Sequence, residues 1–378
     1  KFKKYALVTN YRSAKNIVNF ANEFAQSIPN RLKTERLKAY KTESGKIEII
    51  KHKEKSSMLM YILDAAQKDN SENIAILLRN NEHVLTMYSL LLSHGIKAKY
   101  ISNKDGFSLG DLDELRGFFE YWNEQKDFEK AKARLDLEFR GSKNLKLAHQ
   151  VIDKFEDEHE EEIKTAQNHY LLMFKEYLRE ISFDEFEDTK ARIIVSTMHK
   201  SKGKEFESVY VGIEPDFVKN GYDTRLLYVA ITRAKTNLYI NVKDGILDKY
   251  KHLAGAYGEH AKTYQSPSKI VFMMSLADIF LSSEESGRGI SMTKPKAGEK
   301  VSIAKYGAGF RISKNRVTIA MLAKPSADKL SQKILDKEQK GYVLLEECQI
   351  EYVVRWNDKE GKTYKQVLCR IEMERYGG

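Results

Sequence analysis

The sequence is poor in cysteine and contains no long apolar run. Only two of its 378 residues are cysteine, Cys348 and Cys369. Two cysteines in the C-terminal region form neither a disulfide framework nor a CxxC metal pattern, so we expect a reducing, cytoplasmic location. No apolar stretch approaches the length of a membrane span, and no signal peptide is visible. These absences argue against a disulfide-stabilised secreted domain and against a membrane partner.

The sequence also lacks a complete phosphate-binding loop of the G-x-x-x-x-G-K-[ST] type. Its only GK[ST] string is Gly361-Lys-Thr363, and Trp356 stands where the first glycine of the motif is required. The surrounding residues predict a hairpin turn rather than the strand, loop and helix that the motif needs. A metal site is not expected either, because His159-Glu160 begins an HExxH-like string with Ile163 at the position of the second histidine.

The composition is that of a soluble globular protein with a basic surplus. Hydrophobic residues make up 42% and charged residues 31% of the chain, and its length predicts two or three domains. There are 64 lysines and arginines against 54 acidic residues, a net charge of +10. This balance favours a polyanionic partner such as nucleic acid, because phosphate neutralisation supplies much of such binding.

Residues 1–122 and 191–245 predict a parallel α/β sheet. Short runs such as Ile74–Leu78, Arg192–Ser196 and Val209–Ile213 are rich in apolar and β-branched residues and alternate with helical patterns. Apolar runs of this length, bounded by loops and helices, are typical of buried parallel strands. Polar loops between such strands are where α/β sheets place ligand sites.

The remaining segments differ from the sheet domain in composition and in hydrophobic pattern. Residues 123–190 are charged and helical in pattern, and we expect a helical insertion into the sheet domain. Residues 246–290 predict a helical linker, with helical potential in 269–281. Residues 291–378 contain several strand patterns and one helix, from which we expect a separate, small β-barrel of the OB or SH3 kind.

Three short strings stand out in the predicted sheet domain. They are Asn10-Tyr-Arg-Ser13, Thr197-Met-His-Lys-Ser-Lys-Gly-Lys-Glu-Phe206 and Tyr228-Val-Ala-Ile-Thr-Arg-Ala234. In this order they resemble motifs IV, V and VI of the UvrD, Rep and PcrA group of superfamily 1 DNA helicases. The resemblance covers residues 1–122 and 191–245 and leaves the rest of the chain to be interpreted from its residues alone.

The resemblance implies the second RecA-like lobe of an ATP-dependent DNA helicase. The full protein would translocate along single-stranded DNA and unwind duplex DNA, with a role in DNA repair. This chain would contribute half of the ATP site, while an N-terminal RecA-like lobe would carry the phosphate-binding loop and hold the magnesium ion. We therefore expect a piece of a longer protein that is inactive by itself, as the start at Lys1 rather than Met also indicates.

The resemblance assigns roles around the nucleotide to five residues. Arg12 and Arg233 would reach the γ-phosphate as catalytic arginines, a task that suits a planar, permanently charged guanidinium. Tyr11 would stack on the adenine, Glu205 would accept a hydrogen bond from the ribose, and Gly203 would let the loop backbone approach the nucleotide. The alternatives are a solvated turn for Arg12 and, for Arg233, a cation that favours a helix end.

A basic loop within the second string is the candidate DNA contact. The resemblance assigns Thr197, His199 and Lys200 to the single-stranded DNA track. The alternative is a solvated charged loop, which is the usual state of clustered lysines. Lys204 stands where the family often has an aliphatic residue.

A second hypothesis retains the helicase-like fold but assumes that motor activity has been lost. The chain would then be a helicase-like module that binds DNA or protein without hydrolysing ATP. In either case the C-terminal domain could recruit a repair protein as a further partner.

Overall fold

The computed structural model describes residues 7–31, 35–101, 107–159, 167–181, 183–186, 191–213, 221–243, 245–262, 268–281, 283–334, 342–345 and 347–375. The chain forms two compact units, each made of two segments. Unit 1 comprises Lys1–Asn103 and Thr189–Ser268, and unit 2 comprises Lys104–Asp188 and Lys269–Gly378. No described helix has the length and apolar character needed to cross a membrane.

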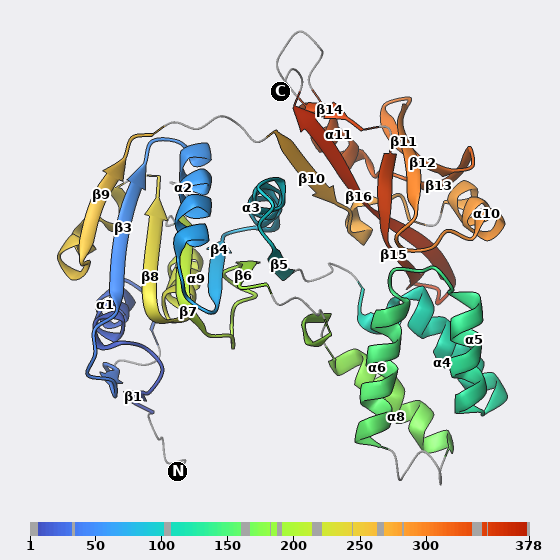
Figure 1. Cartoon of the computed structure of the whole chain (residues 1–378), viewed down its shortest axis with the longest axis horizontal. Coiled ribbons are helices and arrows are strands. Elements are labelled where there is room, and N and C mark those ends of the chain that lie inside the picture. Colours follow the sequence, from blue (N-terminus) through green and yellow to red (C-terminus); the bar gives the residue numbers. More distant parts are fainter. Residues whose placement is uncertain are drawn as a thin grey trace. The chain divides into compact units, whose positions relative to one another are not determined.

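Unit 1 is built on a parallel sheet with the strand order β5-β6-β4-β7-β8-β3-β9 (Figure 1). A separate pair of two-residue strands, β1 (Thr9–Asn10) and β2 (Lys38–Ala39), is also parallel. The strands of the large sheet are β3 (Lys46–His52), β4 (Ile74–Leu78), β5 (Ala98–Ile101), β6 (Ile193–Thr197), β7 (Phe206–Ile213), β8 (Ala234–Val242) and β9 (Ala256–His260). The predicted parallel α/β sheet is therefore confirmed.

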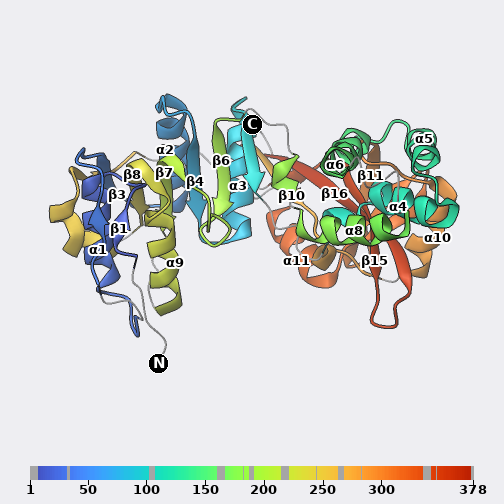
Figure 2. The same cartoon turned by 90° about the horizontal axis from the view of Figure 1, so that it is seen from below.

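Helices cover both faces of this sheet, as β4 shows most clearly. All five of its apolar residues are buried. Ala75 and Leu77 belong to the core formed with α1 (Lys15–Ala25) and α9 (Gly221–Ile231). The alternate residues of β4 face the core formed with α2 (Lys55–Lys68) and α3 (Asn81–Ser93), on the opposite side of the sheet (Figure 2). A strand covered on both faces has no position for a polar side chain, which explains its continuous apolar run.

Unit 2 contains an antiparallel sheet with the order β10-β16-β15-β11-β12-β13, and β14 also pairs with β16. In this order β10 and β13 stand at the two ends, and no pairing between these two strands is described, so the predicted barrel is not confirmed. The turn between β15 and β16 contains Gly361 and Lys362, and Thr363 begins β16, in agreement with the predicted hairpin. The strands are β10 (Lys269–Met273), β11 (Lys300–Tyr306), β12 (Gly309–Lys314), β13 (Val317–Met321), β14 (Tyr342–Leu344), β15 (Glu347–Asn357) and β16 (Thr363–Arg375).

The helices of unit 2 share one hydrophobic core with this sheet. Phe118, Trp122 and Phe174 from the helices and Val353 and Val354 from β15 belong to a single buried cluster. The described helices are η1 (Leu109–Asp111), α4 (Asp113–Gln125), α5 (Phe128–Glu138), α6 (Leu145–Glu158), α8 (Gln167–Glu180), η2 (Phe183–Glu185), η4 (Leu276–Asp278), α10 (Glu284–Thr293) and α11 (Lys324–Lys333). η3 (Gly245–Leu253) belongs to unit 1.

Two features differ from the sequence-based expectations. The helices predicted as an insertion into the parallel sheet, together with α4, pack in unit 2 with the C-terminal sheet, because their aromatic residues face that core. Residues 246–290, predicted as a helical linker, contain the strands β9 and β10. Lys269–Met273 forms a strand because it pairs with β16, about a hundred residues later in the sequence.

Candidate functional site

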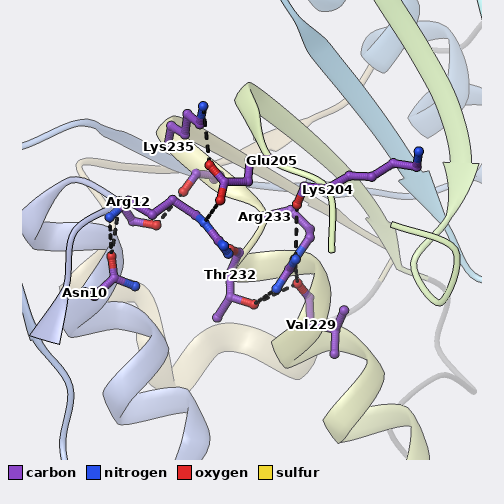
Figure 3. A network of polar contacts seen from close by, with 10 residues as sticks. Asn10, Arg12, Lys204, Glu205, Val229, Thr232, Arg233 and Lys235 are labelled. Atoms are coloured by element: carbon purple, nitrogen blue, oxygen red, sulfur yellow. Dashed lines mark hydrogen bonds and ion pairs between the residues drawn. The ribbon is translucent and has the colours of Figure 1, made fainter. Parts of the chain in front are cut away.

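Three segments that are distant in sequence meet where β7 and β8 begin (Figure 3). The Ser13 hydroxyl donates a hydrogen bond of 2.7 Å to the carbonyl of Ala234, and Ser13 is 2% exposed. The amide of Ala14 donates to the carbonyl of Lys235 at 2.8 Å, and the amide of Phe206 donates to the carbonyl of Arg233 at 3.0 Å. These bonds join the ends of all three helicase-like strings.

Arg12 is presented by a turn that Asn10 organises. The Asn10 Oδ1 accepts hydrogen bonds from the amides of Arg12 at 3.0 Å and Ser13 at 2.9 Å. Asparagine favours such turns because its side chain replaces a backbone acceptor. The Arg12 Nε then donates to Glu205 Oε1 at 2.5 Å, and its Nη1 donates to the Thr232 carbonyl at 3.4 Å. Arg12 thus lies in a turn, as the alternative expects, but its side chain is engaged with Glu205 and Thr232.

Arg233 lies in the turn between α9 and β8 and is held by neutral acceptors. Its Nε donates to the carbonyl of Val229 at 3.0 Å, its Nη1 to the carbonyl of Lys204 at 3.1 Å and its Nη2 to Thr232 Oγ1 at 3.2 Å. No ion pair of Arg233 occurs among the described residues. Its charge is therefore positioned without being neutralised, which suits a group that must meet an anion.

The cluster carries more positive than negative charge. Glu205 is the carboxylate that pairs with Arg12, and its Oε2 also lies 3.3 Å from Lys235 Nζ. Arg233 adds a third cation. Burial lowers the pKa of Arg233 below its ordinary value, and the nearby charge of Arg12 lowers it further. Both effects disfavour the charged guanidinium. An anion bound between the two arginines would favour the charged form of Arg233 and so oppose both effects.

The surroundings of Glu205 favour the ionised form of its carboxyl group. Burial by itself raises the pKa of this carboxyl, but the hydrogen bonds and charges of Arg12 and Lys235 outweigh burial, and the net pKa lies below its ordinary value. An ionised carboxylate offers several acceptor positions. It can therefore hold Arg12 and still accept a hydroxyl hydrogen bond from a ligand.

Tyr11 is 65% exposed and lies beside Tyr40, a residue that the sequence analysis missed. Their ring centroids are 4.7 Å apart with an interplanar angle of 41°. Tyr40 follows β2, and its amide donates to the carbonyl of Asn10 at 2.8 Å, so the pairing of β1 with β2 fixes the two rings together. Tyr40 is itself 67% exposed. No local signal in the sequence points to Tyr40, which lies 27 residues after Ser13.

Gly203 is required by backbone conformation. Its φ is +87°, and a Cβ added there would meet no atom within 4 Å. A positive φ of this kind strongly favours glycine. Within this chain the glycine therefore shapes the turn, and the predicted close approach of a nucleotide stays a prediction.

Thr197, His199 and Lys200 lie where β6 ends, at the carboxyl end of the parallel strands. The arginine cluster lies at the amino end of β7 and β8. Ile74 of β4 pairs with both Ile193 and Ser208, so Thr197 lies six residue positions along the strand direction from the level of Phe206. At about 3.3 Å per residue this is roughly 20 Å. The structure therefore separates the three candidate DNA contacts from the cluster of Arg12, Glu205 and Arg233.

The three candidates differ in their surroundings. Thr197 is 6% exposed, and its Oγ1 accepts from the amide of Lys200 at 3.4 Å. The Lys200 Nζ donates to Asn81 Oδ1 at the start of α3, at 3.0 Å. His199 is exposed. Thr197 thus supports the turn, His199 is open to a partner, and Lys200 is half-buried and engaged with Asn81.

An ion pair beyond the end of β4 was also missed. Arg79, which directly follows this strand, approaches Asp223 of α9 with an Nη2–Oδ2 distance of 3.1 Å. Asp223 is 1% exposed, whereas the Arg79 side chain is 30% exposed. A charged residue directly after a buried strand was the available signal for this pair.

Comparison with known proteins identifies a family to which the chain is similar. The model of a family described as the UvrD-like helicase C-terminal domain matches residues 5–149 and 114–245, which together span more than half of the chain. A solved structure described as the C-terminal domain of a possible DNA helicase from Lactobacillus plantarum WCFS1 is 12% identical. That alignment covers 62% of this chain and 87% of the solved one, with a TM-score of 0.30. No curated protein matches the chain.

Proposed function

The chain belongs to the UvrD-like helicase C-terminal domain family, and on this premise we propose that unit 1 supplies half of the ATP site of a DNA helicase. The observation that carries the proposal is the convergence of Arg12, Glu205 and Arg233 where β7 and β8 begin. Two guanidinium groups beside a single carboxylate form a site with a surplus of positive charge, and the triphosphate of ATP is the polyanion that this family's motors use.

The two arginines would have different parts in hydrolysis. Arg233 is held by three neutral oxygen acceptors, so its charge is ready to stabilise charge that develops on the transferring phosphoryl group. Arg12 is held by Glu205, and it would exchange part of this ion pair for a phosphate oxygen when ATP enters. Tyr11 would stack on the adenine, and Glu205 would accept a ribose hydroxyl.

The remaining parts of the ATP site would come from an N-terminal lobe of the same protein. The described residues contain no group of three His, Cys, Asp or Glu side chains able to hold a metal ion. The magnesium ion that accompanies ATP would therefore be held by that lobe, together with the phosphate-binding loop. This chain alone would not hydrolyse ATP.

The opposite ends of the strands, where β6 ends, would contact single-stranded DNA through Thr197, His199 and Lys200. A continuous segment of eight residues, 198–205, leads from the end of β6 to the start of β7. It therefore connects the candidate DNA contacts with Glu205 in the arginine cluster. A nucleotide that moves Glu205 would strain the same segment that carries His199, which gives a route for coupling hydrolysis to translocation.

The test uses the full-length protein and measures ATP hydrolysis with and without single-stranded DNA. Arg233→Ala should lower DNA-stimulated hydrolysis by about a thousandfold or more, as for other catalytic arginines. Arg225→Ala is the matched control, because Arg225 lies on α9, the helix that precedes the turn of Arg233, but its Nη2 donates to the carbonyl of Pro29 at 2.7 Å. Equal activity in the two variants would contradict the proposal.

The result for the unaltered protein also separates the two hypotheses. DNA binding without any ATP hydrolysis by the unaltered full-length protein would leave a binding module without motor activity as the better account. A cytoplasmic location, a role in DNA repair and a repair-protein partner for unit 2 stay predictions, which rest on the two cysteines and on the family resemblance.

A further inference from the structure

Unit 2 contains a cavity of about 590 Å³ that lies between α4, the end of α5, the segment after α10 and the strands β15 and β16. Its lining combines buried carboxyl groups with lysines and an apolar wall. The cavity is of a size that small-molecule sites commonly have. The cavity belongs to unit 2, whereas the arginine cluster belongs to unit 1.

Glu114 is one of the carboxyl groups that line this cavity. Its side chain is 1% exposed, and its Oε1 accepts a hydrogen bond from the Ser142 hydroxyl at 2.5 Å. Its Oε2 is buried and has no hydrogen-bond partner among the described residues. Leaving a buried carboxyl oxygen unpaired is costly. Burial raises the pKa of Glu114, against the opposing effect of the Ser142 hydrogen bond.

The neighbouring charged groups do not satisfy this oxygen. Asp113 also lines the cavity, and it is paired with Arg355 at 2.6 Å and with Lys365 at 2.8 Å. Lys365 is therefore engaged with Asp113 rather than with Glu114. A donor supplied from within the cavity would give Glu114 Oε2 the partner that it lacks.

The lining of the cavity also contains cationic groups. Lys294 and Lys296 follow α10 and line the same cavity. The Lys296 Nζ donates to the carbonyl of Arg140 at 2.7 Å, a neutral partner. Neither ammonium group forms an ion pair with a carboxylate among the described residues. Two uncompensated lysines on one segment favour an anionic group such as phosphate.

Between the acidic and cationic groups the lining is apolar. Phe139 is 6% exposed and Val353 is 2% exposed, and Pro295 is also buried. Leu137, at the edge, is 66% exposed. A flat ring with an amino group fits such a wall, since its faces would contact apolar atoms while its edge donates to a carboxyl oxygen.

We propose that this cavity binds a nucleotide, with the exocyclic amino group of the base donating to Glu114 and the phosphate held by Lys294 and Lys296. The nucleotide could be free or could be an unpaired residue of single-stranded DNA. Cytosine should be preferred over thymine. The N4 amino group of cytosine can donate a hydrogen bond to Glu114, whereas thymine has a carbonyl at that position.

The experiment measures binding to the whole chain by isothermal titration calorimetry. The probes are deoxycytidine monophosphate, deoxythymidine monophosphate, inorganic phosphate and a decamer of deoxycytidine. We expect deoxycytidine monophosphate to bind more tightly than both deoxythymidine monophosphate and phosphate. The decamer is titrated with the unaltered chain and with Ser291→Trp, which fills the cavity, because unit 1 is also proposed to bind single-stranded DNA. A loss of decamer affinity in Ser291→Trp would identify single-stranded DNA as the source of the nucleotide, and an unchanged decamer affinity would identify a free nucleotide.

Three variants test the assignments of residues. Lys294→Ala with Lys296→Ala should weaken binding about tenfold or more, by loss of charge-assisted contacts, whereas Lys305→Ala with Lys329→Ala, two exposed lysines elsewhere in unit 2, should not. Glu114→Gln should reduce or reverse the preference for cytosine, because an amide can donate to the thymine carbonyl. A purely structural role of Glu114 would not change base preference.

Two further variants control for folding and for the site in unit 1. Ser291→Trp places a bulky ring on an exposed residue that lines the cavity, and it should abolish binding without a change in melting temperature. Arg233→Ala should leave this binding unchanged. No binding of deoxycytidine monophosphate, equal affinity for inorganic phosphate, or full binding by Ser291→Trp would each overturn the proposal.

Discussion

The Nε of Arg12 lies 2.5 Å from Oε1 of Glu205, although the two residues are 193 positions apart in sequence. The ion pair is half open to solvent, with side-chain exposures of 32% and 35%. It connects the turn after β1 with the start of β7. A ligand that approaches this edge of the sheet therefore meets an arginine that is already positioned and a carboxylate that balances only part of the local charge.

The turn that presents Arg12 should depend on the oxygen of Asn10. Asn10→Ala removes the acceptor for the amides of Arg12 and Ser13, so we expect kcat/KM for ATP in the full-length protein to fall about tenfold, the effect of roughly 1.4 kcal/mol. Asn10→Asp keeps an acceptor at the same place and should retain most of the activity. Steady-state hydrolysis of both variants makes the comparison, and equal losses would contradict the role of the turn.

The ion pairs of Glu205 should make a small contribution to stability that depends on pH. The pKa of Glu205 is lowered in the folded protein from an ordinary value of 4.5, so its contribution is present above that pH and is lost as the pH falls through the lowered value. We expect Glu205→Gln to lower the free energy of unfolding by less than about 1 kcal/mol near pH 7, because the pair is partly solvated.

Urea unfolding of the chain at neutral pH and below pH 4 measures this difference. The unaltered chain and Glu205→Gln should approach each other in acid. A difference that grows in acid would show that the pKa of Glu205 is raised rather than lowered.

Tyr40 should affect nucleotide binding without affecting stability. It is 67% exposed and contacts Tyr11, so removing its ring withdraws support from the residue proposed to stack on adenine. Aromatic pairs of this kind are worth about 0.5–1.5 kcal/mol. We expect Tyr40→Ala to raise KM for ATP several-fold in the full-length protein, while Tyr40→Phe stays near normal. An unchanged KM, or an equal effect of both substitutions, would show that the second ring has no part in binding.

Lys200 should contribute one phosphate contact to DNA binding. Its Nζ is held near the start of α3 by Asn81, which places the charge at the edge where β6 ends. Lys200→Ala should weaken binding of single-stranded DNA and reduce the slope of log K against log salt by about 0.7. Lys202→Ala, an exposed neighbour in the same turn, is the control. Fluorescence anisotropy over a salt series makes the measurement, and identical slopes in both variants would exclude a specific contact.

The sequence predicted the parts of the structure whose signals are local. The apolar run of β4 indicated a buried parallel strand, and the three strings contain Arg12, Glu205 and Arg233, which the structure brings together. The strand Lys269–Met273 was not predicted, because its pairing with β16 depends on residues about a hundred positions away. Tyr40 and Glu114 could not be found for a similar reason. Each acquires its significance from a neighbour, Tyr11 or Ser142, that only the folded chain brings close.

The most direct test of the account separates ATP binding from the chemical step in the full-length protein. Binding of a non-hydrolysable ATP analogue and single-turnover hydrolysis with saturating single-stranded DNA would be measured for the unaltered protein, Arg233→Ala and Arg225→Ala. The account predicts that Arg233→Ala binds the analogue within about tenfold of normal but loses about a thousandfold or more in the chemical step, while Arg225→Ala is normal in both. Normal single-turnover hydrolysis by Arg233→Ala would contradict the assignment of this edge of the sheet to ATP hydrolysis.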